Sequence, residues 1–270
     1  MIDLMVHEES RRAQSFGQDA QRYERARPSY PTALIDELVG GPCQRVLDVG
    51  CGTGKAARLL AARGCHVLGV EPDERMAAVA RSYGIPVEAA TFEAWDPSGR
   101  TFDLVVSGQA WHWVDPAVGP VKAAALLAGG GRLAVFWNVA THDQKTQALL
   151  DRAYARHAPA LRMGYVPIGK TRAEDSAHIA AITAPGLFEI PELRAYVWEK
   201  RYSVDEWLDQ LGTHSDHLLL PPGQYAALME AVGAAIDELG GGITIAYHTE
   251  LILARRRDKF LPSGLGFHHG

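Results

Sequence analysis

Short apolar runs alternate with longer, helix-like stretches from residue 45 onward. The apolar runs are residues 45–49, 67–70, 86–88, 102–107 and 133–137, and the Ala- and Leu-rich stretches are residues 55–63, 73–83 and 116–127. Buried strands that alternate with crossover helices are typical of a parallel sheet. Two further strand-like segments, 194–202 and 243–254, return after a region of mixed polar, Pro and Gly residues. The pattern therefore predicts an α/β fold with seven strands in a mostly parallel sheet flanked by helices.

The segments outside this rhythm predict additions to the core. Pro31 suits the first turn of a helix that Gly40 and Gly41 end, so the chain start reads as a cap. Stretches of helical character near 141–182 and 204–239 are expected to form a lid over the carboxyl edge of the sheet. The expected organisation is a helical cap (1–40), a core (41–140), a helical lid or substrate region that includes the strand near 194–202 (141–240), a final strand (241–257) and a tail (258–270).

The most informative local pattern is a glycine-rich turn between the first strand and the first crossover helix. The sequence reads Asp48-Val49-Gly50-Cys51-Gly52-Thr53-Gly54. Glycines allow a backbone to approach a ligand closely and to turn sharply into a helix. The dinucleotide fingerprint G-x-G-x-x-G places its third glycine one position later, and here Lys55 fills that position. Asp48 would also lie close to a diphosphate, so its charge favours a cationic ligand over a dinucleotide.

A second acid lies at the end of the second strand. Glu71 follows Val70 and comes 21 residues after Gly50. An acid at this distance accepts hydrogen bonds from the ribose hydroxyls of adenosine cofactors. Asp73 stands directly before the next helical run, which is the position of a helix cap. Glu71 therefore indicates an adenosine ligand without distinguishing which one.

These motifs resemble those of the class I S-adenosylmethionine (SAM) dependent methyltransferases, in particular the small-molecule branch called methyltransferase type 11 or 25. The resemblance covers residues 16–138 well and the remainder loosely, and it implies a Rossmann-like fold with SAM as cofactor and S-adenosylhomocysteine as product. It implies a cofactor site formed by Tyr23, Arg27, Asp48, Gly50, Cys51, Gly52, Gly54, Glu71, Pro72, Met76, Thr91, Phe92, Gln109 and Ala110.

Individual positions have roles that the resemblance implies. Arg27 would approach the SAM carboxylate, with an ion pair inside the cap as the alternative, and Met76 would pack on adenine or lie in the core. Thr91 and Phe92 stand where the family has a small or acidic residue, so side-chain recognition of the adenine amino group departs from the family pattern. Gln109 and Ala110 follow the fourth strand, at the edge where open α/β sheets bind ligands.

The aromatic segment after the fourth strand supplies candidates for acceptor binding. Trp111 and Trp113 could form an aromatic wall around a cation, or anchor the following helix in the core. Methyl transfer is an in-line displacement that needs a general base only if the acceptor must lose a proton. His112 is the first candidate for that base, and His214 in the lid is the second candidate and a substrate-binding residue.

Composition narrows the classes of partner. The 270 residues carry a formal net charge of -5, which gives no reason to expect binding to a nucleic-acid backbone. The three cysteines lack C-x-x-C spacing, so no metal site is expected and a reducing cytoplasm is the expected location. The start of the chain lacks a signal-like apolar region and no stretch has 18 uninterrupted apolar residues, so no membrane association is expected.

The sequence therefore predicts an enzyme that transfers a methyl group from SAM to a small-molecule acceptor, with an oxygen, nitrogen or carbon atom as the target. No N/D-P-P-Y/F motif follows the fourth strand, which argues against methylation of a DNA base. Two alternatives remain open: a protein that binds SAM without catalysis, and an NAD(P)-dependent oxidoreductase.

Overall fold

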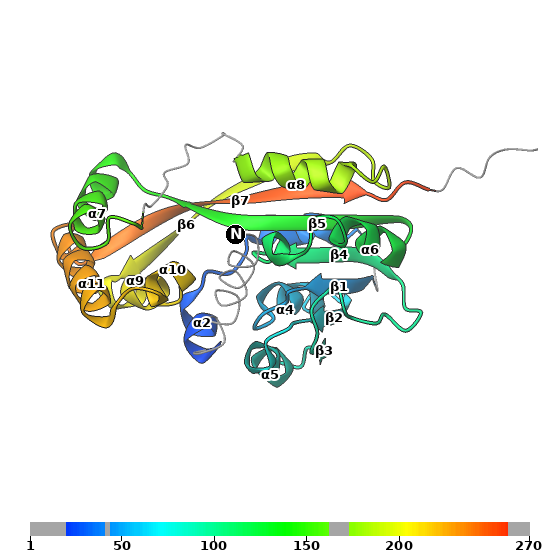
Figure 1. Cartoon of the computed structure of the whole chain (residues 1–270), viewed down its shortest axis with the longest axis horizontal. Coiled ribbons are helices and arrows are strands. Elements are labelled where there is room, and N and C mark those ends of the chain that lie inside the picture. Colours follow the sequence, from blue (N-terminus) through cyan, green and yellow to red (C-terminus); the bar gives the residue numbers. More distant parts are fainter. Residues whose placement is uncertain (1–19, 41–43, 162–172, 259–270) are drawn as a thin grey trace, which may run out of the picture.

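The computed structural model describes residues 20–40, 44–161 and 173–258. Seven strands form one sheet in the order β3-β2-β1-β4-β5-β7-β6 (Figure 1). The strands are β1 (Arg45–Val49), β2 (His66–Val70), β3 (Val87–Glu88), β4 (Phe102–Gly108), β5 (Leu127–Thr141), β6 (Glu192–Ser203) and β7 (Gly242–Arg255). The predicted seven-stranded Rossmann-like sheet is confirmed.

The sheet is parallel from β3 to β5 and antiparallel at β7. Strands β1, β2, β3, β4 and β5 pair in parallel, whereas β7 runs antiparallel to both β5 and β6. The strand predicted at 133–137 is only the centre of β5, because β5 and β7 continue their pairing as far as Thr141 and Ala246. This extension carries the β5–β7 ladder beyond the carboxyl end of β4, whose last residue pairs with Phe136.

Helices cover both faces of the sheet. The helices are α2 (Ala20–Ala26), α3 (Thr32–Leu38), α4 (Lys55–Ala61), α5 (Glu74–Ser82), α6 (Gly119–Leu126), α7 (Gln144–His157), α8 (Ala173–Thr183), α9 (Val204–Leu211), α10 (Ser215–Leu218) and α11 (Pro222–Asp237). One core cluster joins one face of the central strands to α3, α4 and α5, and the other joins the opposite face to α6 and α8. Neighbouring strand residues such as Val46 and Leu47 enter opposite clusters, as the period of a strand requires.

A third cluster forms around the far ends of β6 and β7. It unites α7, α9 and α11, with Trp207, Tyr202 and Tyr247 among its buried side chains. These helices gather at one end of the molecule in Figure 1, whereas α8 lies over the sheet with Ile182 fully buried against it. The segment expected as a lid, residues 141–240, thus contains both a helical end region and a helix that covers the sheet. Among the described helices, none is long and apolar enough to cross a membrane.

Candidate cofactor and acceptor site

The glycine loop leaves β1 along a path that only glycine follows easily. Gly50, Gly52 and Gly54 have φ angles of 64°, 55° and 83°, in the left-handed region. A Cβ atom on Gly50 would also lie 2.5 Å from the Cβ atom of Ala110. The structure therefore brings the loop after β1 and the loop after β4 into direct contact, as expected if both belong to one site.

Glu71 connects the glycine loop to the start of α5. Its Oε2 accepts a hydrogen bond from the backbone N–H of Gly52 at 2.9 Å, and its Oε1 accepts one from the N–H of Asp73 at 3.0 Å. Burial raises the pKa of the Glu71 carboxyl, and these two backbone donors oppose that shift. Asp73 caps α5, as its position indicated, by accepting from the N–H groups of Arg75 and Met76. Each carboxylate oxygen of Glu71 keeps a further lone pair for a ligand hydroxyl.

Asp48 is a buried acid with an unsatisfied oxygen. Its side chain is 1% exposed, and its Oδ2 has no hydrogen-bond partner among the described residues. Desolvation raises the pKa of Asp48 to about 8, and the nearby Glu71 carboxyl adds to the shift. A ligand with a positive charge would stabilise the ionised form of this group. The orphaned oxygen and the glycine cradle fit a cationic cofactor such as SAM.

The other predicted cofactor residues occupy several different environments. Met76 is buried, and its Cε lies 3.5 Å from the position that a Cβ atom on Gly52 would take. Cys51 instead points into the core, because its Sγ lies 2.5 Å from the position of a Cβ atom on Gly69 in β2. Pro72 is exposed beside Glu71. Met76 is thus adjacent to the glycine loop, whereas the thiol of Cys51 faces away from it.

The aromatic side chains divide between core and surface. Phe92 and Trp111 are both buried, with ring centroids 6.2 Å apart, and Trp111 is the indole that anchors the segment after β4 in the core. Trp113 is 36% exposed, and Thr91 is also exposed. The two indoles therefore do not form one aromatic wall.

The cap helix α2 is tied to the glycine loop by one acidic residue. Glu24 on α2 accepts a hydrogen bond from Thr53 Oγ1 at 2.5 Å and forms ion pairs with Lys55 and Arg58 on α4. Its side chain is only 11% exposed, so these charged contacts are partly shielded from water. Sequence reasoning missed Glu24, because nothing in the pattern of α2 distinguishes it from a solvated acid.

Arg27 joins the cap to the lid. Its Nε donates to Thr213 Oγ1 at 2.7 Å and a terminal nitrogen donates to the Thr213 carbonyl at 3.0 Å. The guanidinium also lies over the ring of Tyr23, 5.3 Å from its centroid. Among the described residues, no carboxylate pairs with Arg27. The guanidinium is therefore fixed in place while its charge remains available to a ligand.

The histidine predicted as a general base lies outside the cavity between the cap and the lid, close to His178 of α8. His112 is exposed at the surface, and its Nδ1 accepts a hydrogen bond from Trp137 Nε1 at 3.3 Å. Desolvation of the ring and the neighbouring His178 lower the pKa of His112 to about 4. At neutral pH the ring is uncharged with one nitrogen already in use, which makes it a weak base.

A cavity of about 320 Å³ lies between the cap, the carboxyl ends of β4 and β5, and the lid. Of the predicted residues it brings together Tyr23, Arg27, Gln109 and His214, but not His112, Trp111 or Trp113. The other lining residues come from distant parts of the chain: Pro28, Tyr30, Lys55, Asn138, Val139, Ala140, His142, Gln147, Trp207, Gln210, Leu211, Asp216 and Tyr247. Gln109, with a φ of 61°, also donates through Nε2 to the carbonyl of Asn138 at 3.2 Å.

Sequence analysis missed most of this lining. Neither Trp207 nor His142 stands in a local motif that marks it as a ligand-binding residue. The lining residues share no spacing, because they meet only when α9 and the end of β5 pack together.

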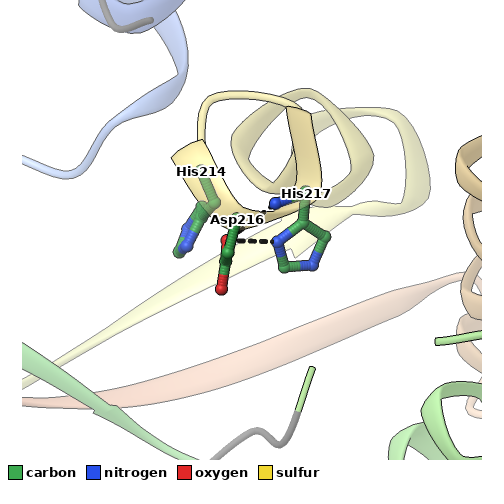
Figure 2. A group of neighbouring side chains, drawn as sticks. All are labelled: His214, Asp216 and His217. Atoms are coloured by element: carbon green, nitrogen blue, oxygen red, sulfur yellow. Dashed lines mark hydrogen bonds and ion pairs between the residues drawn. The ribbon is translucent and has the colours of Figure 1, made fainter. Parts of the chain in front are cut away.

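A turn beside the cavity gathers two histidines and an acid that could hold a metal ion by proximity. Atoms of His214, Asp216 and His217 lie within 4.8 Å of one another (Figure 2). However, His217 Nδ1 already bonds Asp216 Oδ1 at 2.8 Å and His217 Nε2 bonds the Tyr154 hydroxyl at 2.7 Å. Both ring nitrogens of His217 are therefore already in use, which leaves this residue no nitrogen for a metal ion.

Comparison with known proteins shows which domain family residues 46–131 match. The methyltransferase domain family matches residues 46–131, from β1 into β5. Uncharacterized methyltransferases of Mycobacterium tuberculosis and Mycobacterium bovis are 42% identical over 134 residues, which are 48% of this chain and 54% of those proteins. The trans-aconitate 2-methyltransferase of Mycobacterium ulcerans is 33% identical over 138 residues, 50% of this chain and 51% of that protein. The chain spans about half the length of these relatives.

Solved structures share the fold. A structure from Anaeromyxobacter dehalogenans, provisionally assigned as a type II methyltransferase, has a TM-score of 0.61 and 24% identity, with 85% of this chain and 97% of that chain covered. The phosphoethanolamine N-methyltransferase 2 of Haemonchus contortus has a TM-score of 0.51 and 16% identity, with 90% of this chain and 58% of that chain covered. The resemblance found in the sequence is confirmed: residues 46–131 match the methyltransferase domain family, and the fold is that of solved methyltransferase structures.

Proposed function

We propose that this protein transfers the methyl group of SAM to a small-molecule acceptor that binds in the cavity between the cap and the lid. The observation that carries the proposal is the pair of buried acids, Asp48 and Glu71, on two sides of the glycine loop. A cationic sulfonium and ammonium suit the orphaned Oδ2 of Asp48, and ribose hydroxyls suit Glu71. Relatives such as the trans-aconitate 2-methyltransferase are named for small acceptors.

The proposed role of each residue follows from its position. The glycine loop, Met76, Thr91, Phe92 and Ala110 would hold the cofactor, and Arg27 and Gln109 would face both the cofactor and the acceptor cavity. SAM supplies an activated methyl group, so the chain's own residues need to align the acceptor and exclude water. The cavity of about 320 Å³ is large enough for a small metabolite and is bordered by α9 and the cap.

SAM and S-adenosylhomocysteine binding should be measured by calorimetry, next to NAD and NADP. We expect micromolar binding of the SAM pair and at least tenfold weaker binding to Glu71→Gln, because that change removes the charged acceptor for ribose hydroxyls. Glu74→Gln is the matched control: Glu74 is exposed on α5, and among the described residues it pairs only with Arg81. Equal losses in both variants would refute the role of Glu71.

The two alternative functions predict different results in the binding and transfer experiments. Binding of a nicotinamide cofactor in place of SAM would identify an oxidoreductase. Tight SAM binding with no methyl transfer to any of a broad set of small acceptors would identify a non-catalytic SAM-binding protein. We expect neither, and we expect the protein to act in the cytoplasm on a small molecule rather than on nucleic acid.

A further inference from the structure

Three ring nitrogens in the lining of the acceptor cavity, together called the donor wall, have no hydrogen-bond partner among the described residues. They are Trp207 Nε1, His142 Nδ1 and His214 Nε2, and all three are buried atoms. Each of these residues lines the cavity, and Trp207 is only 2% exposed. Buried polar atoms in native proteins are almost always hydrogen-bonded. Three such nitrogens in the lining of one cavity indicate a ligand that would supply the missing hydrogen-bond partners.

The chemistry of these nitrogens restricts the group that they can bind. The indole N–H of Trp207 can only donate a hydrogen bond. Desolvation lowers the pKa values of His142 and His214, so both rings are neutral in the free protein and each can offer one N–H. The rings of His142 and Trp207 meet edge to face, with centroids 5.8 Å apart. The wall therefore supplies donors to a group that accepts hydrogen bonds.

The charges around the cavity favour an acceptor with one negative charge. Arg27 has no carboxylate partner among the described residues, whereas Lys55 is paired with Glu24. Asp216 also reaches the lining, but it is 48% exposed and its Oδ1 is held by His217. A dianionic group such as a phosphate monoester would meet Asp216 with only one free cation to offset it. A carboxylate needs less compensation.

Neutral hydroxyl acceptors fit less well. A phenol or alcohol must lose its proton during transfer, and histidines with lowered pKa values are poor recipients of that proton. A carboxylate is already ionised at neutral pH. It can therefore attack the methyl group without a base in the cavity.

From this donor wall we propose that the acceptor is a carboxylic acid, whose carboxylate binds against Trp207, His142 and His214, and that the product is its methyl ester. The inference rests on the proposed function. A carboxylate oxygen forms the new bond to the methyl carbon as the bond from that carbon to sulfur breaks. The electron pair stays on sulfur, so the cation and the anion become a neutral thioether and a neutral ester, and no proton moves.

The first test uses probes that differ only in the proposed group. Benzoate and hexanoate, each beside its amide, are titrated into protein saturated with S-adenosylhomocysteine. We expect each carboxylate to bind at least tenfold more tightly than its amide. Trp207→Phe keeps the ring but removes the donor, and should weaken carboxylate binding at least tenfold without weakening S-adenosylhomocysteine binding. Carboxylates and amides that bind equally well would overturn the proposal.

Trp95→Phe is the matched control. Trp95 is as deeply buried as Trp207, but its Nε1 already donates to Glu88 Oε2 and it does not line the cavity. Trp95→Phe should lower the melting temperature and leave probe binding unchanged. Trp207→Phe should keep or raise the melting temperature of the free protein, because it removes a buried donor that has no partner. A loss of probe binding that is equal in both variants would also overturn the proposal.

The product provides a second test that does not depend on affinity. The protein is incubated with SAM labelled in the methyl group and a panel of carboxylic acids, phenols and amines that includes the two probes. Methyl esters release labelled methanol in mild alkali, whereas aryl ethers and methylamines do not. Alkali-stable label, or no ester from any acid while S-adenosylhomocysteine binds, would refute the carboxylate inference. Loss of S-adenosylhomocysteine binding would instead refute the proposed function.

Discussion

The buried carboxyl of Asp48 should make SAM binding depend on pH. Its pKa is raised to about 8 by desolvation and by Glu71, so most of the carboxyl is protonated in the free protein at pH 7. The sulfonium and ammonium of SAM favour the ionised carboxylate, and binding below pH 8 must therefore release a proton. We expect close to one proton released for each SAM bound at pH 7.

The size of the effect follows from proton linkage. Between pH 6 and pH 7.5 the ionised fraction of a group with a pKa of about 8 rises about 25-fold, and the affinity for SAM should rise by up to that factor. The α-amino group of SAM stays mostly protonated in this interval, because such groups have pKa values of about 7.7 to 8.0. The change in SAM affinity between pH 6 and pH 7.5 should therefore reflect mainly the titration of Asp48.

The same shift acts on the stability of the free protein with the opposite trend. Because the folded pKa of Asp48 is above its ordinary value, the folded state binds the proton more tightly than the unfolded state. Stability should fall as pH rises from about 4 to about 8, by about 6 kcal/mol at most, at about 1.36 kcal/mol for each pKa unit. Asp48→Asn should abolish this slope and raise the melting temperature at pH 8.

Calorimetry of SAM binding in two buffers with different ionisation enthalpies measures the released proton directly. Wild-type protein should give buffer-dependent heats at pH 7, and Asp48→Asn should bind SAM weakly and without that dependence. Asp103→Asn is the control, since Asp103 is a partly exposed acid that pairs with Arg45. An affinity for SAM that stays constant from pH 6 to pH 7.5, with no proton released, would refute the reasoning about Asp48.

Three further changes test the frame around the site. Gly50→Ala should lower the free energy of unfolding by roughly 2 to 4 kcal/mol, because Gly50 has a positive φ and an added Cβ atom would clash. Gly64 also has a positive φ but lies in open space, so Gly64→Ala should cost about 1 kcal/mol. Chemical denaturation compares the two variants, and equal costs would contradict the clash at Gly50. Thr213→Val removes the hydroxyl that accepts a hydrogen bond from Arg27. It should raise the KM for the acceptor severalfold with little change in melting temperature. Unchanged kinetics would show that this hydrogen bond does not position Arg27. The pKa of His112 is about 4 in the folded protein, so protonation of His112 opposes folding as pH falls. His112→Gln should therefore lose less stability than the wild type between pH 6.5 and pH 4. Identical curves of stability against pH for the wild type and the variant would contradict the lowered pKa.

The local sequence determined the cofactor loop and the character of the sheet. Asp48, the glycines and Glu71 are specified by short-range patterns, because a strand, a turn and a helix that follow one another fix the geometry between neighbours. Alternating apolar runs likewise predicted the strands, and the right number of crossovers followed from their spacing. What the pattern could not give was the length of β5, since its extension to Thr141 depends on pairing with β7, more than a hundred residues away.

The acceptor cavity was decided by tertiary structure alone. Arg27 meets Thr213 across 186 residues, and His142 meets Trp207 only because α9 packs beside the end of β5. A tryptophan in an amphipathic helix has the same local pattern whether its indole N–H is satisfied in the core or left open to a ligand. Burial and the absence of a partner distinguish the two cases, and both are properties of packing rather than of sequence spacing.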